Sequence, residues 1–203
     1  VARLSEKGKI DAGAADHILN RVHPTQNLAE AVKDADYVVE AVTEDFGLKG
    51  DIFKELDQQA PGHAIFASNT SQFSITELAA CTRRPDQVIG MHFFNPPVLM
   101  RLIEVVKGLE TSEDTLEQSL ALARGMDKEV VVCKDSQGFI TSRLINLWVT
   151  EADRILEEGI ATKEDIDKAC RLAFNHPMGP FELSDFSGLD TRLHVSKSLE
   201  NAL

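Results

Sequence analysis

Apolar residues recur along the chain with two different periods, and these periods predict helices and strands in alternation. Helical spacing occurs over residues 2–20, over 48–56, and in 27–33, which opens with Asn27 and Glu30 in capping-box form. Short runs rich in β-branched residues predict strands over 37–42, 64–67, 88–94, 102–106 and 129–133. Further helices are predicted near 75–82 and over 112–126. This alternation indicates βαβ units and a mostly parallel sheet, with the strands 37–42 and 64–67 covered on both faces.

The pattern changes after Asp135-Ser-Gln-Gly138. Residues 139–158 predict one long helix that stops before Gly159, and Thr162 with Asp165 is typical of the start of the next helix. No strand is predicted beyond Cys133. The expected fold class is therefore α/β: an incomplete Rossmann-like, mostly parallel sheet in a domain of residues 1–134, followed by an all-helical C-terminal domain of residues 135–203.

Composition excludes several classes of protein. The 21 basic residues stand against 33 acidic residues, and the formal net charge of −12 has the wrong sign for a nucleic-acid or anionic-membrane surface. No apolar run approaches the ~20 residues of a membrane helix, so we expect a soluble protein without membrane or nucleic-acid partners. Cys81, Cys133 and Cys170 are far apart and show no CxxC spacing. They predict buried thiols in a reducing compartment rather than disulfides or a metal site.

Polar residues follow the predicted strands at their carboxyl ends, where ligands bind in an open parallel sheet. Glu44 follows the first strand, Ser68-Asn-Thr-Ser71 the second, and Asn95 the third. Two charged or titratable residues lie inside strands, namely His92 and Glu104. Polar groups from neighbouring strands are thus expected to converge at one edge.

His92 and Glu104 form the sharpest candidate pair. His92 is flanked by large apolar residues, and imidazole can take a proton near neutral pH. If the two strands are neighbours, the Glu104 carboxylate can hold one imidazole nitrogen and leave the other for a substrate. The alternative is a core histidine bonded to backbone and an edge glutamate that faces solvent.

Other features have structural explanations or are missing. The residues Ser68 to Ser71 and Asn95 also suit ordinary turns and caps, and the segment His176-Pro-Met-Gly-Pro180 predicts a tight interhelical turn. The sequence contains no GxSxG, HExxH, Walker or EF-hand pattern, which disfavours hydrolase, metalloprotease, P-loop and calcium sites. It also lacks the strand, GxGxxG and helix that open a dinucleotide-binding fold.

Five motifs, however, resemble the 3-hydroxyacyl-CoA dehydrogenase family, in particular the 3-hydroxybutyryl-CoA dehydrogenases. They run in order along nearly the whole chain: Ser68-Asn-Thr-Ser71, Gly90-Met-His-Phe-Phe-Asn-Pro96, Leu102-Ile-Glu-Val-Val106, Asp135-Ser-Gln-Gly-Phe-Ile140 and Pro177-Met-Gly-Pro-Phe-Glu-Leu183. The resemblance implies NAD-dependent oxidation of an L-3-hydroxyacyl-CoA, with a short acyl chain, to the 3-ketoacyl-CoA.

The resemblance also implies roles for catalytic residues. His92 matches the general base, and Glu104 matches the carboxylate that orients it. Ser71 matches the serine that bonds the substrate oxygen beside the nicotinamide, and Asn95 matches the asparagine that positions the cofactor and the developing oxyanion.

Two further residues, Glu44 and Lys49, fall where the family contacts the NAD riboses. The chain departs from the family at Ser142, where an asparagine commonly reaches the active site. We expect the substrate contact of Ser142 to be weaker, water-mediated or absent. The family's Gly-rich phosphate turn should precede Val1 and its tail should follow Leu203, so we expect a fragment with both ends missing.

The helical domain is expected to form a homodimer, as such helices do in the family, and the protein to lie in a bacterial cytoplasm, or in the mitochondrial matrix if eukaryotic. The apolar residues on one side of its long helix are Ile140, Leu144, Leu147, Trp148, Ile155 and Leu156. Two alternatives remain: a non-catalytic acyl-CoA-binding or structural member of the family, and a dehydrogenase of free 3-hydroxy acids. The second usually depends on a lysine base, and residues 88–104 contain no lysine.

Overall fold

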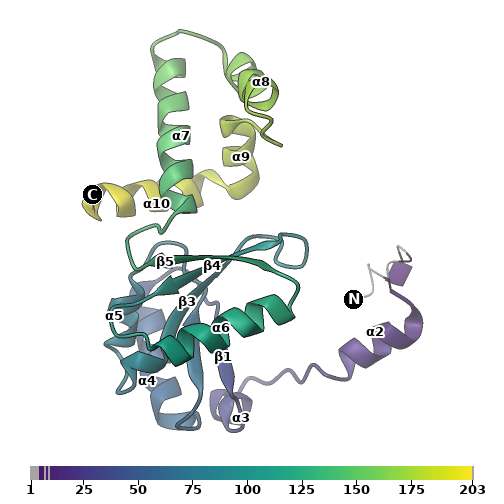
Figure 1. The fold of residues 1–203 in the computed structure, drawn as a ribbon. Coiled ribbons are helices and arrows are strands. Elements are labelled where there is room, and N and C mark those ends of the chain that lie inside the picture. Colours follow the sequence, from purple (N-terminus) through teal and green to yellow (C-terminus); the bar gives the residue numbers. More distant parts are fainter. Residues whose placement is uncertain (1–4, 7, 9, 203) are drawn as a thin grey trace.

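The computed structural model describes residues 5, 6, 8 and 10–202 and contains one five-stranded sheet (Figure 1). The strands lie in sequence order and are β1 (Tyr37–Glu40), β2 (Ile65–Ser68), β3 (Val88–Phe93), β4 (Leu102–Lys107) and β5 (Glu129–Lys134). Neighbouring strands are parallel except β3 and β4, which are antiparallel. The predicted mostly parallel sheet is confirmed.

Helices cover both faces of this sheet (Figure 1). On one face lie α3 (Leu28–Val32), α4 (Phe46–Gln59) and α5 (Ile75–Ala79), and on the other lies α6 (Glu113–Gly125). A short 3-10 turn, Pro85–Gln87, leads into β3. The first apolar core joins α4 and α5 to the sheet through buried side chains that include Phe53, Leu56, Phe66, Ile75 and Leu78. The second core packs α6 on Ile65, Ala67, Ile89, Met91 and Ile103.

The first predicted strand differs from expectation in length and burial. β1 ends at Glu40 rather than at residue 42, and Val39 is 42% exposed, so this strand is not covered on both faces. Within the described residues β1 pairs with β2 alone and is an edge strand. Its end has a local cause, because the Glu40 carboxylate accepts a hydrogen bond from the Val42 amide at 2.7 Å and turns the chain. β2, in contrast, is buried at every residue, as predicted.

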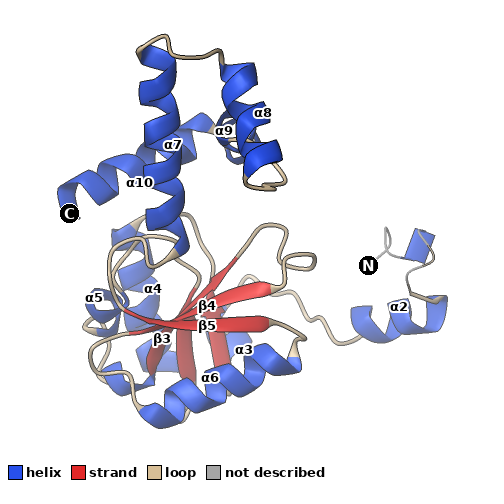
Figure 2. Ribbon diagram, turned by 45° about the horizontal axis from the view of Figure 1, so that its top comes forward, coloured by secondary structure: helices blue, strands red, loops and turns tan. Residues whose placement is uncertain are grey.

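Four helices follow the sheet and stand at one end of it (Figure 2). They are α7 (Thr141–Glu157), α8 (Lys163–Ala173), α9 (Pro180–Ser187) and α10 (Leu189–Ala202). Thr162 caps α8 by accepting a hydrogen bond from the Asp165 amide. The predicted turn His176–Pro180 leads from α8 into α9 and ends at the first residue of α9. Asp167 of α8 accepts hydrogen bonds from the amides of Phe181 and Glu182 in α9. The α/β fold class with an all-helical C-terminal part is confirmed.

Two predicted helices differ from the structure in their N-terminal parts. The long helix starts at Thr141, because Phe139 adopts a left-handed backbone with φ of 49° in the turn that precedes it. At the other end, the predicted helix 2–20 is represented by α2 (Ala12–Leu19), and Leu4 lies outside the described residues. In both views α2 stands apart from the sheet (Figures 1 and 2). None of the described helices has the length and apolar character needed to cross a membrane.

Gly90 marks the tightest approach between β3 and its surroundings. A Cβ atom at this position would lie 2.8 Å from Cβ of Val106 in β4 and 2.9 Å from Cδ1 of Ile75 in α5. Both neighbours are fully buried, so they have little room to move. The close approach brings β3 and β4 together two residues before His92.

We expect Gly90→Ala to lower the free energy of unfolding by about 1–3 kcal/mol, because the added methyl group overpacks the core. Urea unfolding measures this change. Gly125→Ala is the matched control: a Cβ there meets no atom within 4 Å, and alanine is favoured over glycine in a helix. Equal stability of Gly90→Ala and the wild type would contradict the tight packing.

Candidate functional site

The antiparallel register of β3 and β4 places His92 directly opposite Glu104. Residues that face each other across two strands project to the same side of the sheet. The imidazole Nδ1 of His92 lies 2.7 Å from Oε2 of Glu104, which is a hydrogen bond. Glu104 has no solvent exposure and His92 is nearly buried. The contact that the sequence left open is therefore present, and the alternative of an edge glutamate facing solvent is wrong.

The Glu104 carboxylate also receives two hydrogen bonds from Thr141, the first residue of α7. The Thr141 amide donates to Oε1 at 3.0 Å, and the Thr141 hydroxyl donates to Oε2 at 2.8 Å. Burial raises the pKa of Glu104, but the hydrogen bonds from His92 and Thr141 outweigh it and hold that pKa below its ordinary value. The ionised carboxylate thus stabilises the fold above about pH 4, and this contribution is lost as the pH falls through the lowered pKa.

Aromatic rings enclose the imidazole. The ring centroid of Phe94 lies 4.6 Å from that of His92, and the ring centroid of Phe139 lies 5.9 Å away. The left-handed turn at Phe139 brings its ring under the histidine. Because Nδ1 is bonded to Glu104, Nε2 is the nitrogen that remains for a ligand. The histidine is therefore oriented and partly shielded from water.

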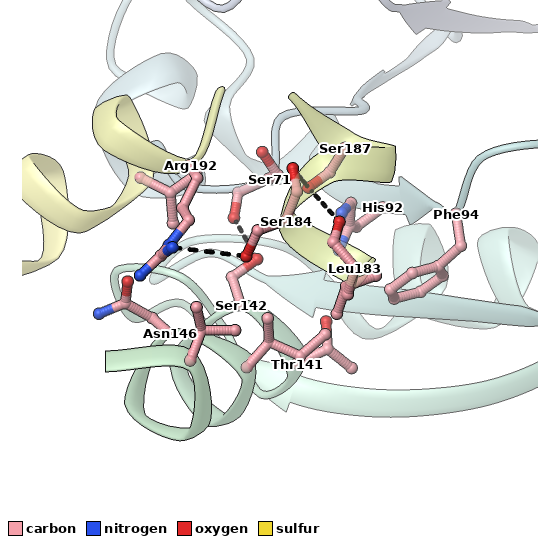
Figure 3. A pocket seen from close by; sticks show the side chains of 13 residues that line it. Ser71, His92, Phe94, Thr141, Ser142, Asn146, Leu183, Ser184, Ser187 and Arg192 are labelled. Atoms are coloured by element: carbon pink, nitrogen blue, oxygen red, sulfur yellow. Dashed lines mark hydrogen bonds between the residues drawn. The ribbon is translucent and has the colours of Figure 1, made fainter. Parts of the chain in front are cut away.

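His92 lines a cavity of about 240 Å³ between the sheet and the helices (Figure 3). Figure 3 shows His92 from β3 and Phe94 just after this strand on one side, Ser142 and Asn146 from α7 below, and Ser184 and Ser187 from α9. The remaining lining residues are Ser71, Thr141, Ile145, Val149, Leu183, Arg192 and Val195. A mostly apolar lining with a few hydroxyl groups suits an acyl chain in which one carbon bears an oxygen.

Ser71 reaches this cavity from the loop that follows β2. Ser142 also lines the cavity, and its hydroxyl donates to the Ser71 carbonyl at 3.1 Å, so it holds this loop as well. At the far wall, Arg192 pairs with Asp153 and lies 3.4 Å from the Ser184 hydroxyl. The structure thus brings together three of the predicted site residues, His92, Ser71 and Ser142, on one cavity.

Glu44 and Lys49 hold the loop that carries Ser71. The Glu44 carboxylate accepts hydrogen bonds from the Thr70 hydroxyl at 2.6 Å and from the Ser71 amide at 2.9 Å. Lys49 is only 1% exposed, and its Nζ lies 2.8 Å from Oε1 of Glu40 and 3.2 Å from Oε2 of Glu44. Lys49 therefore holds two carboxylates in place and presents little surface to a ligand.

Asn95 is exposed just beyond β3 and does not line the cavity. The peptide bond between Asn95 and Pro96 is cis. A different asparagine, Asn69, supports the strand by accepting a hydrogen bond from the Phe93 amide at 2.8 Å.

Sequence reasoning missed Thr141, Asn146, Ser184, Ser187 and Arg192. They lie on helices, and no motif in the sequence singles them out.

The cysteines are free, as expected, but only Cys170 is buried, while Cys81 and Cys133 are half-buried. Burial, together with the nearby carboxylates of Glu104 and Asp135, raises the pKa of Cys133 to about 11, so it stays a thiol. Among the described residues, no group of three histidine, cysteine or acidic side chains is arranged to hold a metal ion.

Comparisons with known proteins cover the whole chain. A family model described as "3-hydroxyacyl-CoA dehydrogenase, NAD binding domain" matches residues 1–136, and one described as "3-hydroxyacyl-CoA dehydrogenase, C-terminal domain" matches residues 138–203. A "Probable 3-hydroxybutyryl-CoA dehydrogenase" of Bacillus subtilis is 45% identical over all 203 residues, which span 70% of that relative. A mitochondrial "Hydroxyacyl-coenzyme A dehydrogenase" of Sus scrofa is 45% identical over 93% of this chain, which covers 60% of its length.

The fold also matches a solved structure. The (S)-3-hydroxybutyryl-CoA dehydrogenase of Ralstonia eutropha superposes with a TM-score of 0.95 at 40% identity, over 99% of this chain and 71% of that one.

The buried cluster around Lys49 gives a test of how the Ser71 loop is held. Lys49→Met leaves Glu40 and Glu44 without their cation, and we expect a loss of about 3–5 kcal/mol in the free energy of unfolding, because one buried charge then lacks its partner. Urea unfolding measures the loss. Lys54→Met is the control, since Lys54 pairs with Asp51 on the surface and such pairs contribute at most about 1 kcal/mol. Similar effects of the two variants would show that the Lys49 cluster does not stabilise the fold.

Proposed function

Because the chain belongs to the 3-hydroxyacyl-CoA dehydrogenase family, we propose that it oxidises an L-3-hydroxyacyl-CoA to the 3-ketoacyl-CoA with NAD as hydride acceptor. The observation that carries this proposal is the hydrogen bond between His92 and Glu104 at the wall of a largely apolar cavity. Relatives named 3-hydroxybutyryl-CoA dehydrogenase support a short acyl chain.

The residues beside the cavity fit a nicotinamide nucleotide. The loop after β2 lies at the carboxyl end of the sheet, where such cofactors bind, and Ser71 of this loop lines the cavity. When bound, NAD accepts a hydride from the substrate carbon that bears the hydroxyl. Glu44, which fixes the Ser71 amide, would contact a ribose, and Lys49 would keep Glu44 in place through their ion pair.

His92 acts as the general base in this proposal. Nε2 takes the proton of the substrate hydroxyl, and the Glu104 carboxylate stabilises the imidazolium that forms. The Ser71 hydroxyl, which donates to Glu44 at 3.3 Å in this structure, would turn to donate to the oxygen as it becomes a carbonyl. Phe94 and Phe139 keep water from the imidazole.

Asn95 and Ser142 have supporting roles in this proposal. Asn95 would contact the cofactor and the developing oxyanion from outside the cavity wall, where it is exposed. Ser142 binds the Ser71 carbonyl and therefore supports substrate binding through the Ser71 loop.

The two parts of the chain have different functions in this proposal. We propose an NAD-binding domain of residues 1–134 and a helical substrate and dimerisation domain of residues 135–203. A homodimer is supported by apolar side chains that α7 leaves exposed, among them Leu144 at 62% and Leu147 at 69%. A reducing compartment, such as bacterial cytoplasm or mitochondrial matrix, is supported by the free cysteines and by the bacterial and mitochondrial relatives.

The proposed activity is tested with acetoacetyl-CoA and NADH in the complete encoded protein. We expect turnover by the wild type and a loss of about 10²–10⁴ in kcat for His92→Gln, which removes the base. The far-ultraviolet circular dichroism spectrum should stay unchanged. His63→Gln is the control, because His63 is an exposed histidine that bonds a carboxylate, Asp36, far from the cavity.

Two results would contradict the proposal in different ways. A folded wild type without turnover would favour the non-catalytic acyl-CoA-binding alternative. Wild-type turnover by His92→Gln would leave the activity in place but refute the assignment of the base.

A further inference from the structure

Thr141 makes a contact that neither its place in a helix nor the roles assigned above explain. It is the first residue of α7, and a side chain there is free to point away from the helix end. Its hydroxyl instead crosses to β4 and donates to Oε2 of Glu104 at 2.8 Å. The same oxygen accepts the hydrogen bond from Nδ1 of His92 at 2.7 Å. One carboxylate oxygen thus serves two donors.

We propose that the Thr141 hydroxyl is a positioning group for the reaction. It donates to the second acceptor site of Glu104 Oε2 and so keeps the carboxylate in place beside His92. The same hydrogen bond reduces the electrostatic effect of the carboxylate on the imidazole. This inference rests on the proposed function, because it assigns the hydroxyl a part in preparing the general base.

The backbone cannot take over this role. The Thr141 amide donates to the other oxygen, Oε1, at 3.0 Å, so it holds the opposite side of the carboxylate. Oε2 is left with the hydroxyl and the imidazole as its donors. Two donors on one oxygen compete for the same electron density, and each weakens the other. Loss of the hydroxyl therefore strengthens the hydrogen bond and the electrostatic attraction between Glu104 and the protonated imidazole.

Few other charges act on this pair. Cys133 on β5, which pairs with Val106, lies near enough to Glu104 for the carboxylate to raise its pKa, and it remains an uncharged thiol. Arg192 shares the cavity with His92, but its charge is balanced by Asp153. Glu44 reaches the cavity only through Ser71 and is paired with Lys49. Two uncharged aromatic rings, those of Phe94 and Phe139, pack near the imidazole. The hydroxyl is thus the neighbour whose removal changes the pair most directly.

Three variants separate an effect of the Thr141 hydroxyl on the protonation of His92 from an effect on packing alone. Thr141→Val keeps the shape and the amide but removes the hydroxyl, Thr141→Ser keeps the hydroxyl, and Thr150→Val makes the same replacement elsewhere on α7. The first measurement follows the titration of the His92 ring by proton NMR, with His92→Gln used to assign its signal. The second is the pH profile of kcat/KM for oxidation of 3-hydroxybutyryl-CoA.

We expect Thr141→Val to move the midpoint of the ring titration upward by about 0.5 pH unit, a threefold change in the protonation equilibrium. The acid limb of kcat/KM should move upward by the same amount, because the base must be neutral to act. Thr141→Ser should restore both midpoints, and Thr150→Val should leave them unchanged.

Unchanged midpoints in Thr141→Val would overturn the inference, and so would equal shifts in Thr141→Val and Thr150→Val. A loss of stability without a shift would assign Thr141 a structural role and overturn it as well. Since the ring titration needs no substrate, it tests Thr141 even if the wild type shows no turnover, and the two proposals can fail separately.

Discussion

A carboxylate without solvent exposure lies in the middle of β4, and its need for hydrogen-bond donors determines how the parts of the site meet. Leaving the ionised Glu104 unpartnered in the core would cost several kcal/mol. The fold meets this need from two sides: β3 supplies the imidazole of His92, and the start of α7 supplies the amide and hydroxyl of Thr141. Sheet and helices are thereby joined at one side chain.

Several features of the backbone serve this arrangement. The antiparallel pairing of β3 with β4 is the one exception in a parallel sheet, and it sets His92 opposite Glu104. The left-handed turn at Gly138 and Phe139 lies between β5 and α7 and directs the first turn of α7 toward the Glu104 carboxylate. The same turn buries the Phe139 ring beside the imidazole. The cavity forms where these elements meet, so its chemistry depends on the packing of β4.

Periodicity was enough to predict the strands, the alternation with helices and the change to an all-helical part, because burial and helix caps act locally. The pairing of His92 with Glu104 could only be offered as one of two alternatives, since strand neighbours depend on long-range packing. The burial of Lys49 and the exposure of Val39 were missed for the same reason. Thr141 was missed because its hydroxyl bonds a residue 37 positions away, and nothing in a single threonine signals such a partner.

The central claim is that Glu104 fixes His92 with Nδ1 protonated and Nε2 free. Nitrogen-15 NMR of the histidine rings in the folded protein, with His92→Gln for assignment, tests this directly. The account predicts that neutral His92 exists almost wholly as the Nδ1–H form, with a strongly downfield Nδ1 proton. An Nε2–H form, or an equal mixture of the two, would show that the carboxylate does not orient the imidazole and would contradict the account.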